Sequence, residues 1–495
     1  MAVVSHRSAR PTSVPFAARA IVLAAVLVFP ILVVGHGHLP ADDALRHAAK
    51  AVSGRAWDEI LVLRPDMAGD AHPGWHALLT GLHALAATSA HSLVLFSVAS
   101  LFLAFSLGPA LSLRRPEAWL FALLVLAVAD PAVLSRLLQG RPLLVSAAAV
   151  TVLCLLHPRL REEKPPWGPI AALTVIFAAA TWMHGSWYLF ALPVACVFLA
   201  GARQAGWRLV ATLAVGIAVG ALLSGEPFRV LIQAVRHAIL ALRTPEPSTL
   251  AVEFQPFSGS PLMVVAVAGM LGWRALRGAW QQQTVRNPTF LLAALGWVLG
   301  FVAVRFWSDW GVPAALVWMA REMEEFLEAQ QPLASPRRLA TLAAFGTAAG
   351  LAISSDVGGR YGAVRPDRSW LSLYLSAEEP AHAPWLPDPG GVLYSTEMRL
   401  FYRTFYKNPT APWRYVLGFE PGLMPPEDLS VYRAYMTGGG DATPLLAWVD
   451  RMRMVDRLFV VHHSDQPPPL PRLEWHQVLR GLWSGRLPRG PASSS

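Results

Sequence analysis

Asp42 and Asp43 form an acidic pair directly after the first long apolar stretch of the chain, where they open an alanine-rich segment. A carboxylate held at a membrane surface can act as a general base that takes a proton from a hydroxyl group. An aspartate in this position can also cap a helix by accepting the backbone N–H groups of its first turn. Helix capping would account for one of the two carboxylates but not for the second.

Histidines are concentrated in the same region, and residues 36–91 hold seven of the 15 in the chain. Histidine and carboxylate side chains are common ligands of divalent metal ions. The candidate ligands are His36, His38, His47, His72 and His76, together with Asp43 and Asp70. His72 and His76 have the spacing that shares one face of a helix, although no common third ligand is evident. A divalent metal ion is therefore an open alternative, and the sequence establishes no cofactor.

Several basic side chains near the outer ends of apolar stretches could bind a phosphate group. Arg136 and Arg141 flank a short connection, and the guanidinium fork of arginine suits phosphate oxygens. Arginines at helix ends also extend toward the interface without binding any ligand. Arg305 is predicted to pair with Asp309 one helical turn later, as a structural ion pair.

His184 stands among aromatic residues, between Trp182 and Trp187, at the outer end of an apolar stretch. Its imidazole could hydrogen-bond to phosphate or to sugar hydroxyls. It could equally anchor the stretch in the aromatic belt that lines membrane interfaces. The sequence does not decide between these two roles.

The elements that must position these side chains are apolar helices. The chain has 495 residues, of which 54% are hydrophobic and 15% charged, with a mean hydropathy of +0.40. Soluble proteins carry about a quarter charged residues, so this composition argues against a free-standing cytosolic enzyme. About eleven apolar stretches could cross the hydrocarbon layer. They are residues 17–35, 92–112, 117–135, 142–157, 168–184, 186–202, 208–224, 260–276, 289–307, 311–324 and 338–354.

Basic residues between these stretches predict the orientation in the cytoplasmic (inner) membrane. With the N-terminus in the cytoplasm, the connection that follows each even-numbered stretch lies on the cytoplasmic side. Each of these five connections carries a cluster of basic residues, as the positive-inside rule requires. These clusters are Arg114-Arg115, Arg159 with Arg161 and Lys164, Arg203 with Arg208, Arg274 with Arg277 and Arg286, and Arg337-Arg338. An odd number of spans then places the C-terminal part outside. Because the net charge of +9 belongs mainly to the membrane part, we expect no nucleic-acid partner.

The predicted fold is an all-α polytopic membrane domain followed by a small α/β domain. Residues 1–354 form the membrane domain, which includes a large first outer loop at 36–91. Residues 355–470 alternate strand-like and helix-like patterns, which predicts an extracytoplasmic soluble α/β domain. The stretch 471–495 is basic, rich in glycine, proline and serine, and expected to be loose.

Two amphipathic segments have more than one interpretation. Within the outer domain, strands are predicted at 391–394, 413–419 and 456–461, and helices at 397–406 and 427–436. The first of these helices interleaves aromatic and basic residues that could hold an anionic glycan. We favour the alternative in which Leu400, Phe401 and Phe405 pack a core. The stretch 228–242 predicts a helix that lies in the interface or, as we prefer, packs on neighbouring spans.

The first outer loop resembles that of membrane-embedded glycosyltransferases of the C fold class (GT-C), which include protein O-mannosyltransferases and the aminoarabinose transferase of lipid A. Those proteins carry an acidic pair that opens a helix, a Ser-Gly-x-Trp-like turn, and a Lys- or His-Pro-Pro stretch entering another helix. The matching segments here are Asp42–Ala48, Ser53–Trp57 and Asp70–Trp75, in the same order. Gly74 stands in place of the second proline. The resemblance covers mainly residues 40–85.

This resemblance implies an inverting glycosyltransferase that takes a sugar from a polyprenyl-phosphate donor at the outer face of the cytoplasmic membrane. Asp43 would act as the base, with Asp42 as the alternative, and the acceptor would be a hydroxyl of a lipid or a glycan. The residues expected to bind the donor phosphate and substrate are Arg136, Arg141, His184, His72 and Asp70.

The sequence leaves two other functions open. A membrane assembly protein could bind a lipid-linked or surface glycan without catalysing transfer. A transporter would need polar residues near the middle of the bilayer, where Asp130, beside Pro131, is the chief candidate.

Overall fold

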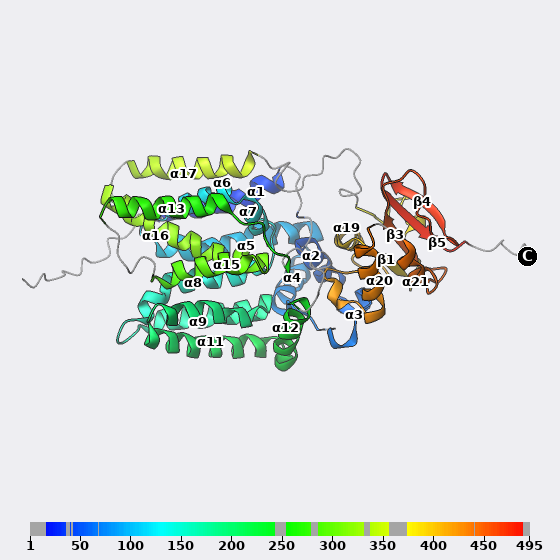
Figure 1. The fold of residues 1–495 in the computed structure, drawn as a ribbon, viewed down its shortest axis with the longest axis horizontal. Helices are drawn as coiled ribbons and strands as arrows, with labels where there is room; N and C mark the ends of the chain where they lie inside the picture. The colour runs from blue at the N-terminus through cyan, green and yellow to red at the C-terminus, as the bar shows by residue number, and fades with distance from the viewer. Residues whose placement is uncertain are drawn as a thin grey trace, which may run out of the picture.

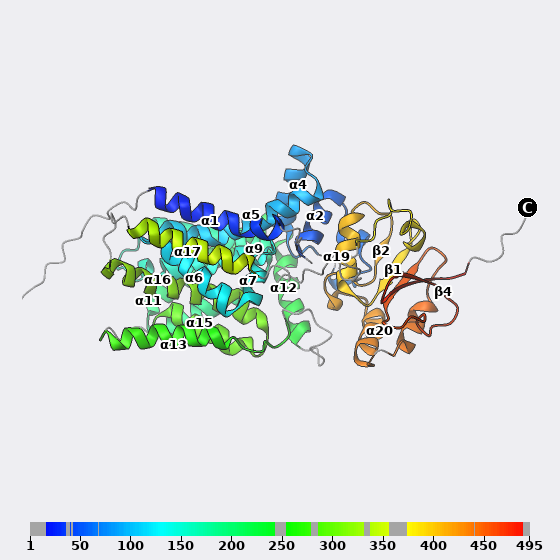
Figure 2. The same ribbon diagram turned by 90° about the horizontal axis from the view of Figure 1, so that it is seen from above.

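The computed structural model divides the protein into a bundle of long apolar helices and a smaller α/β domain at one end of that bundle (Figure 1). The structure describes residues 16–35, 40, 43–67, 69–242, 254–278, 286–330, 337–355, 374–439 and 441–488. Short helices of the first outer loop lie between the two parts in both views (Figures 1 and 2). The predicted combination of an α-helical domain with a small C-terminal sheet is thereby confirmed.

Every apolar stretch predicted from the sequence is mainly helical. The helices are α1 (Phe16–Gly35), α5 (Ala90–Ser112), α6 (Glu117–Ala129), α7 (Pro131–Leu137), α8 (Leu143–Leu160), α9 (Trp167–His184), α10 (Ala191–Leu199), α11 (Arg203–Leu223), α13 (Pro261–Leu276), α15 (Pro288–Gly300), α16 (Val312–Gln330) and α17 (Arg337–Ser354). Among the described residues, five helices are long and apolar enough to cross a membrane, namely α1, α5, α8, α9 and α11. They indicate a membrane protein, while the number of crossings and the orientation stay predictions.

One of the predicted spans is interrupted by a proline. The stretch predicted as continuous from 117 to 135 breaks at Asp130, because Pro131 has no backbone N–H to continue the helix. Asp130 instead caps α7 by accepting the backbone N–H of Val133, and its other oxygen accepts the indole N–H of Trp307 at 2.9 Å. This structural role accounts for the one polar residue that had suggested a transporter.

A buried ion-pair network closes the opposite end of the bundle. Glu117 is fully buried and lies 3.2 Å from Arg115 and 3.0 Å from Arg338. Glu324, on α16, accepts the backbone N–H groups of Arg114 and Arg115. Two of the arginines used to predict the orientation are therefore buried partners of carboxylates, and the network joins α6, α16 and α17.

The first outer loop folds into helices α2 (Asp43–Ser53), α3 (Trp57–Ile60) and α4 (Pro73–Ala86), with the 3₁₀ turn η1 (Pro65–Met67) between α3 and α4. Pro73 suits the first position of α4, where no backbone N–H is needed. A Cβ atom at Gly74 would lie 2.4 Å from the indole of Trp182. Close packing of α4 against α9 therefore leaves no room for a side chain at position 74.

The α/β domain contains one five-stranded sheet in the order β2-β1-β3-β5-β4. Its strands are β1 (Val392–Ser395), β2 (Arg414–Tyr415), β3 (Arg457–Val461), β4 (Glu474–Leu479) and β5 (Leu482–Arg486). Its main helices are α19 (Met398–Lys407) and α20 (Pro426–Thr437), with the shorter α21 (Leu446–Val449) and the 3₁₀ turns η7 (Ala383–Trp385), η8 (Pro421–Leu423) and η9 (Thr443–Leu445). Strands β1, β2 and β3 are parallel, whereas β5 is antiparallel to β3 and β4. The predicted strands at 391–394 and 456–461 and both predicted helices are confirmed, and the strand predicted at 413–419 is reduced to two residues.

The prediction of a loose tail from residue 471 is wrong for residues 474–486. They form the hairpin of β4 and β5, which turns at Arg480 and Gly481. Gly481 adopts a φ of +85°, which a glycine accommodates without strain in a tight turn. Leu482 and Trp483 point to opposite faces of β5 and are both buried, so the burial of these side chains outweighs the loop-like composition around them.

The first outer loop and the α/β domain share one hydrophobic core. Trp57 and Leu61 pack with Phe401 and Phe405 of α19, and Val62 donates a backbone hydrogen bond of 2.9 Å to Tyr415 of β2. This shared core fixes the position of the loop between the membrane helices and the sheet.

The amphipathic stretch at 228–242 forms helix α12 (Pro227–Leu242) at the junction of the two parts (Figure 1). Gln233 exchanges two hydrogen bonds with the backbone of Gly69, at 2.8 and 3.1 Å. The structure therefore supports the interpretation in which this helix packs on neighbouring elements. These hydrogen bonds connect α12 to the first outer loop.

The ion-pair network predicts a large effect of Glu117→Gln on stability. Removing the charge leaves Arg115 and Arg338 buried against a neutral amide, which should destabilise the protein by about 3–5 kcal/mol. Thermal unfolding in detergent measures this loss. Glu162→Gln is the matched control, because Glu162 is 48% exposed beside Arg159 and should change stability by less than about 1 kcal/mol. Equal melting temperatures for Glu117→Gln and wild type would contradict the role of the network.

Candidate active site

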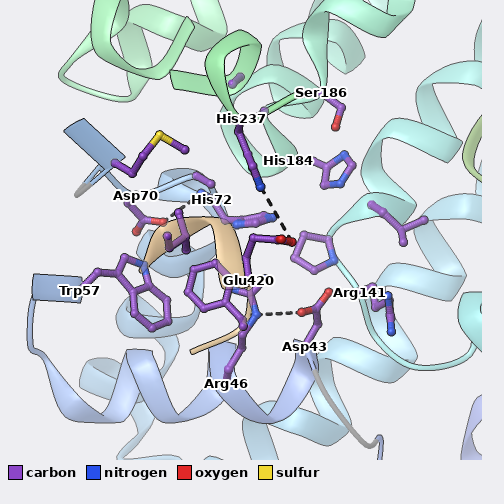
Figure 3. A pocket seen from close by; sticks show the side chains of 18 of the residues that line it. Asp43, Arg46, Trp57, Asp70, His72, Arg141, His184, Ser186, His237 and Glu420 are labelled. Carbon is purple, nitrogen blue, oxygen red and sulfur yellow. Dashed lines mark hydrogen bonds and ion pairs between the residues drawn. The ribbon is translucent and has the colours of Figure 1, made fainter. Parts of the chain in front are cut away.

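A cavity of about 390 Å³ lies where the apolar helices, the first outer loop, α12 and the α/β domain meet. Figure 3 shows side chains from all four regions pointing toward the same space. The charged and histidine side chains that line it are Asp43, Arg46, Asp70, His72, Arg136, Arg141, His184, His237, Arg305, Asp309, Glu397, Arg399 and Glu420. The site residues predicted from the sequence that the structure describes contribute to this lining, except His47 and His76. These two histidines are hydrogen-bonded to each other, and His76 is hydrogen-bonded to Asp70 of the lining. Asp42, His36 and His38 lie outside the described residues.

Asp43 is the first residue of α2, and each of its oxygens faces a different arginine. Oδ1 accepts a hydrogen bond of 2.7 Å from Nε of Arg46, and Oδ2 lies 4.0 Å from Nη1 of Arg141. Burial by itself would raise the pKa of Asp43, but the charges of Arg46 and Arg141 outweigh burial and hold that pKa below its ordinary value. The carboxylate is therefore ionised throughout the neutral range.

Arg46 connects Asp43 to the α/β domain. Its guanidinium lies 4.0 Å from the ring centre of Phe419, and its side chain is only 5% exposed. Atom Nη1 of Arg46 is buried and has no hydrogen-bond partner among the described residues. Sequence analysis missed this residue, although its spacing of three from Asp43 on a helix was a usable signal.

A second carboxylate, Asp309, pairs with two further arginines of the cavity, Arg136 and Arg305. It is 2% exposed, and its oxygens lie 3.6 Å from Nε of Arg136 and 3.8 Å from Nε of Arg305. The predicted pair of Arg305 with Asp309 is confirmed, but it belongs to a larger cluster, since Arg305 also donates to Ser186 at 2.9 Å. Asp309 lies in the π-helical turn η5 (Phe306–Gly311), and such turns are frequent at functional sites.

Arg141 reaches the cavity from the short connection between α7 and α8. The preceding residue, Gly140, has a φ of +67°, and a Cβ atom there would lie 2.8 Å from the backbone nitrogen of Val98. Only glycine fits this conformation and this contact. The close packing fixes the backbone from which the Arg141 side chain extends.

Asp70, His76 and His47 form a buried hydrogen-bonded chain beside the cavity. The distance from Asp70 Oδ2 to His76 Nδ1 is 2.6 Å, and that from His76 Nε2 to His47 Nδ1 is 2.7 Å. Burial lowers the pKa of His76 although Asp70 acts in the opposite direction, and burial together with Arg46 lowers the pKa of His47 further. Both rings are therefore neutral, so His76 donates to Asp70 through Nδ1 and accepts from His47 through Nε2.

His72 and His184 face each other across the cavity wall, with ring centres 5.9 Å apart. His184 Nδ1 is 2.8 Å from Oγ of Ser146, which gives its ring a fixed orientation at the end of α9. Burial, with the charge of Arg46 and the neighbouring His184, holds the pKa of His72 well below its ordinary value. The imidazole of His72 can therefore offer a hydrogen bond without adding a positive charge.

A metal site is not formed by the histidines that the structure describes. Among the described residues, no group of three His, Cys, Asp or Glu side chains is arranged to hold a metal ion. His72 and His76 were predicted on one helix face, but His72 precedes α4 and the two ring centres are 6.2 Å apart.

The α/β domain supplies the outer wall of the cavity. Glu397, Tyr402, Phe419 and Glu420 come from this domain, and Glu420 lies 3.9 Å from His237 of α12 (Figure 3). In α19, Leu400, Phe401 and Phe405 are buried in the core, so the core-packing interpretation of this helix is confirmed. Sequence analysis missed Phe419 and Glu420, because nothing in their local pattern distinguishes them from other residues of a loop.

Comparison with known proteins finds a similar fold among solved structures and no similar sequence. No family model matches the sequence, and no curated protein matches it. Among solved structures, the chain is similar to the oligosaccharyltransferase of Archaeoglobus fulgidus tethered with an acceptor peptide. The two chains are 12% identical, the TM-score is 0.49, and the match covers 88% of this chain and 68% of that one. The interpretation of the site therefore rests on its own residues.

The Asp70 chain predicts a pH-dependent contribution to stability. Burial raises the pKa of Asp70, but His76 and the backbone N–H of His72 outweigh burial and lower it below its ordinary value. Stability from this group is thus fully present above the ordinary aspartate pKa of about 3.9 and is lost as the pH falls below it.

We expect Asp70→Asn to destabilise the protein by about 1–2 kcal/mol at pH 7, with the difference shrinking toward about pH 3. Thermal unfolding at a series of pH values measures it. Asp66→Asn is the control, because Asp66 is 48% exposed beside Arg64 and should have little effect. A difference that does not change with pH would show that the Asp70 charge is unimportant.

Proposed function

We propose that this protein is a membrane glycosyltransferase that transfers a sugar from a polyprenyl-phosphate donor to an acceptor hydroxyl. The observation that carries the proposal is the position of one ionised carboxylate, Asp43, in the same cavity as Arg136, Arg141 and Arg305. A base and a group of phosphate-binding cations are the two requirements of this reaction. The resemblance of the first outer loop to GT-C enzymes supports the same conclusion.

The proposed reaction is a single displacement at C1 of the donor sugar. Asp43 takes the proton of the acceptor hydroxyl while the acceptor oxygen forms a bond to C1. The bond between C1 and the phosphate oxygen breaks, and its electron pair stays on the departing polyprenyl phosphate. Attack from the face opposite the leaving group inverts the configuration at C1.

The arginines match the charge that develops in this step. The departing lipid phosphate gains one negative charge, which cationic groups in a partly buried site stabilise more strongly than water does. Arg136 and Arg305 both approach Asp309 through Nε, so one carboxylate orients both guanidinium groups. His72 and His184 are placed to donate hydrogen bonds to phosphate or to sugar hydroxyls.

The location of the cavity suits a donor that cannot leave the bilayer. Its inner wall is formed by the ends of apolar helices, through Arg136 of α7, Leu143 of α8 and His184 of α9, and its outer wall by the α/β domain. A polyprenyl chain could stay among the helices while its phosphate and sugar enter the cavity. The acceptor would approach from the side of the α/β domain, which we place outside the cytoplasmic membrane.

Replacing the proposed base tests this function directly. Asp43→Asn should lower the rate of transfer by about 10²–10⁴-fold, because the amide cannot accept the proton. The measurement is release of free polyprenyl phosphate by the purified protein from polyprenyl-phosphate sugars, with mass spectrometry of surface glycans and lipids from a deletion strain to name donor and acceptor.

Asp58→Asn is the matched control, because Asp58 lies in the same loop, is exposed, and does not line the cavity. It should transfer sugar at the wild-type rate. Full activity of Asp43→Asn would remove Asp43 as the base. Saturable binding of the donor by wild type without any release of polyprenyl phosphate would favour a non-catalytic glycan-binding or lipid-binding protein instead.

A further inference from the structure

The ion pairs of Asp43 create a difficulty for its proposed role as a base. A carboxylate stabilised by two guanidinium groups has a low proton affinity, because protonation would forfeit both attractions. A general base works best when its pKa lies near the operating pH. In the arrangement seen here Asp43 is ionised but weakly basic, so something must change before it can take a proton efficiently.

The two arginines that hold Asp43 differ in how they are attached. Arg46 is on the same helix, donates at 2.7 Å, and is covered by Phe419, so it stays with Asp43 as long as the α/β domain stays docked. Arg141 is on the connection between α7 and α8, lies at the limit of ion-pair distance, 4.0 Å, and lines the cavity. Its long side chain can change partner while the backbone beside Gly140 stays fixed.

We propose that Arg141 is shared between Asp43 and the donor phosphate, so that binding of the donor draws Arg141 away and turns Asp43 into an effective base. This inference rests on the proposed function and extends it from the identity of the base to its control. The protein would then bind the donor before it could deprotonate the acceptor.

The electrostatics of the cavity favour this exchange. The phosphodiester of the donor carries one negative charge, as Asp43 does, and its two free oxygens can accept both N–H groups of the Arg141 fork, whereas Asp43 Oδ2 lies 4.0 Å from Arg141. Its arrival beside Asp43 also adds a like charge, which raises the proton affinity of the carboxylate. Among the described residues, the titratable groups that also act on Asp43 include His72 and His184, which line the same cavity, and Arg46, which keeps the carboxylate oriented.

Charge is balanced over the proposed step. Before transfer, Arg141 compensates the phosphodiester of the donor, and Asp43 retains Arg46. During transfer the proton moves from the acceptor hydroxyl to Asp43 as the phosphate gains one negative charge next to Arg141. Asp43 becomes neutral at the moment when Arg141 is most strongly held by the leaving group.

Thermodynamic linkage makes the sharing measurable without knowing the sugar. If Asp43 and a phosphate compete for Arg141, removing the Asp43 charge must strengthen phosphate binding, and it must do so through Arg141. The probe is farnesyl phosphate, a short prenyl phosphate, whose dissociation constant is measured by calorimetry in detergent at pH 7 for wild type, Asp43→Asn, Arg141→Gln and the double variant.

We expect Asp43→Asn to bind farnesyl phosphate about three- to tenfold more tightly than wild type, and Arg141→Gln to bind it more weakly by a similar factor. In the Arg141→Gln background, Asp43→Asn should increase the affinity for farnesyl phosphate by a factor at least threefold smaller than in the wild-type background. Arg141→Lys keeps the charge and should restore most of the coupling. Thermal unfolding verifies that each variant is folded.

Asp70→Asn is the matched control, because Asp70 is a carboxylate of the same cavity that pairs with His76 rather than with Arg141. Its effect on the dissociation constant should be equal in both Arg141 backgrounds. Inorganic phosphate is titrated in parallel, and weaker binding of it would show that the prenyl chain contributes as expected of a lipid donor.

The outcomes separate this inference from the proposed function. Binding of farnesyl phosphate with equal gains from Asp43→Asn in both backgrounds, or with no gain at all, would overturn the sharing of Arg141 and leave the donor class intact. No binding of farnesyl phosphate to wild type would overturn both. Sharing of Arg141 predicts that Asp43→Asn strengthens farnesyl phosphate binding when Arg141 is present, that Arg141→Gln removes most of this effect, and that Arg141→Lys retains it.

Discussion

The ion pairing of Asp43 with guanidinium groups from two different regions is the constraint on which the rest of the site depends. A carboxylate in a largely buried cavity is unstable unless cations compensate its lost hydration. Arg46 provides one cation and is covered by Phe419 of the α/β domain. Arg141 provides the other from the connection after α7, which turns tightly at Gly140. The apolar helices, the first outer loop and the α/β domain must therefore all be assembled before Asp43 is stable in this position.

The same principle organises the inner wall of the cavity. Asp309 is more deeply buried than Asp43, and it too is compensated by two arginines, Arg136 and Arg305. Neighbouring histidines are neutral because burial and the surrounding arginines oppose their protonation. Among the described residues that line the cavity, arginines are thus the charged groups whose sign suits a phosphate, and the carboxylates between them set their positions. This arrangement of alternating charges is what makes a phosphate-binding and proton-accepting function physically reasonable.

Some features could be predicted from the sequence because they depend on local patterns. Apolar stretches predicted helices, the alternation of strand-like and helix-like segments predicted the α/β domain, and the pair of Arg305 with Asp309 followed from helical spacing. Other predictions failed where tertiary packing outweighed composition. The hairpin at 474–486 buries Leu482 and Trp483 within a loop-like sequence, and Pro131 divides what hydropathy marks as one continuous span.

The sequence by itself determined which helices are apolar, where the acidic pair stands, and which arginines lie near helix ends. It did so because hydrophobic periodicity and backbone preferences act over a few neighbouring residues. Only the tertiary structure decided that Arg46 rests on Phe419 and that Asp130 bonds to Trp307, a residue 177 positions away. Such contacts depend on how helices and domains pack against one another, and no local pattern encodes the partner that a buried charge will meet.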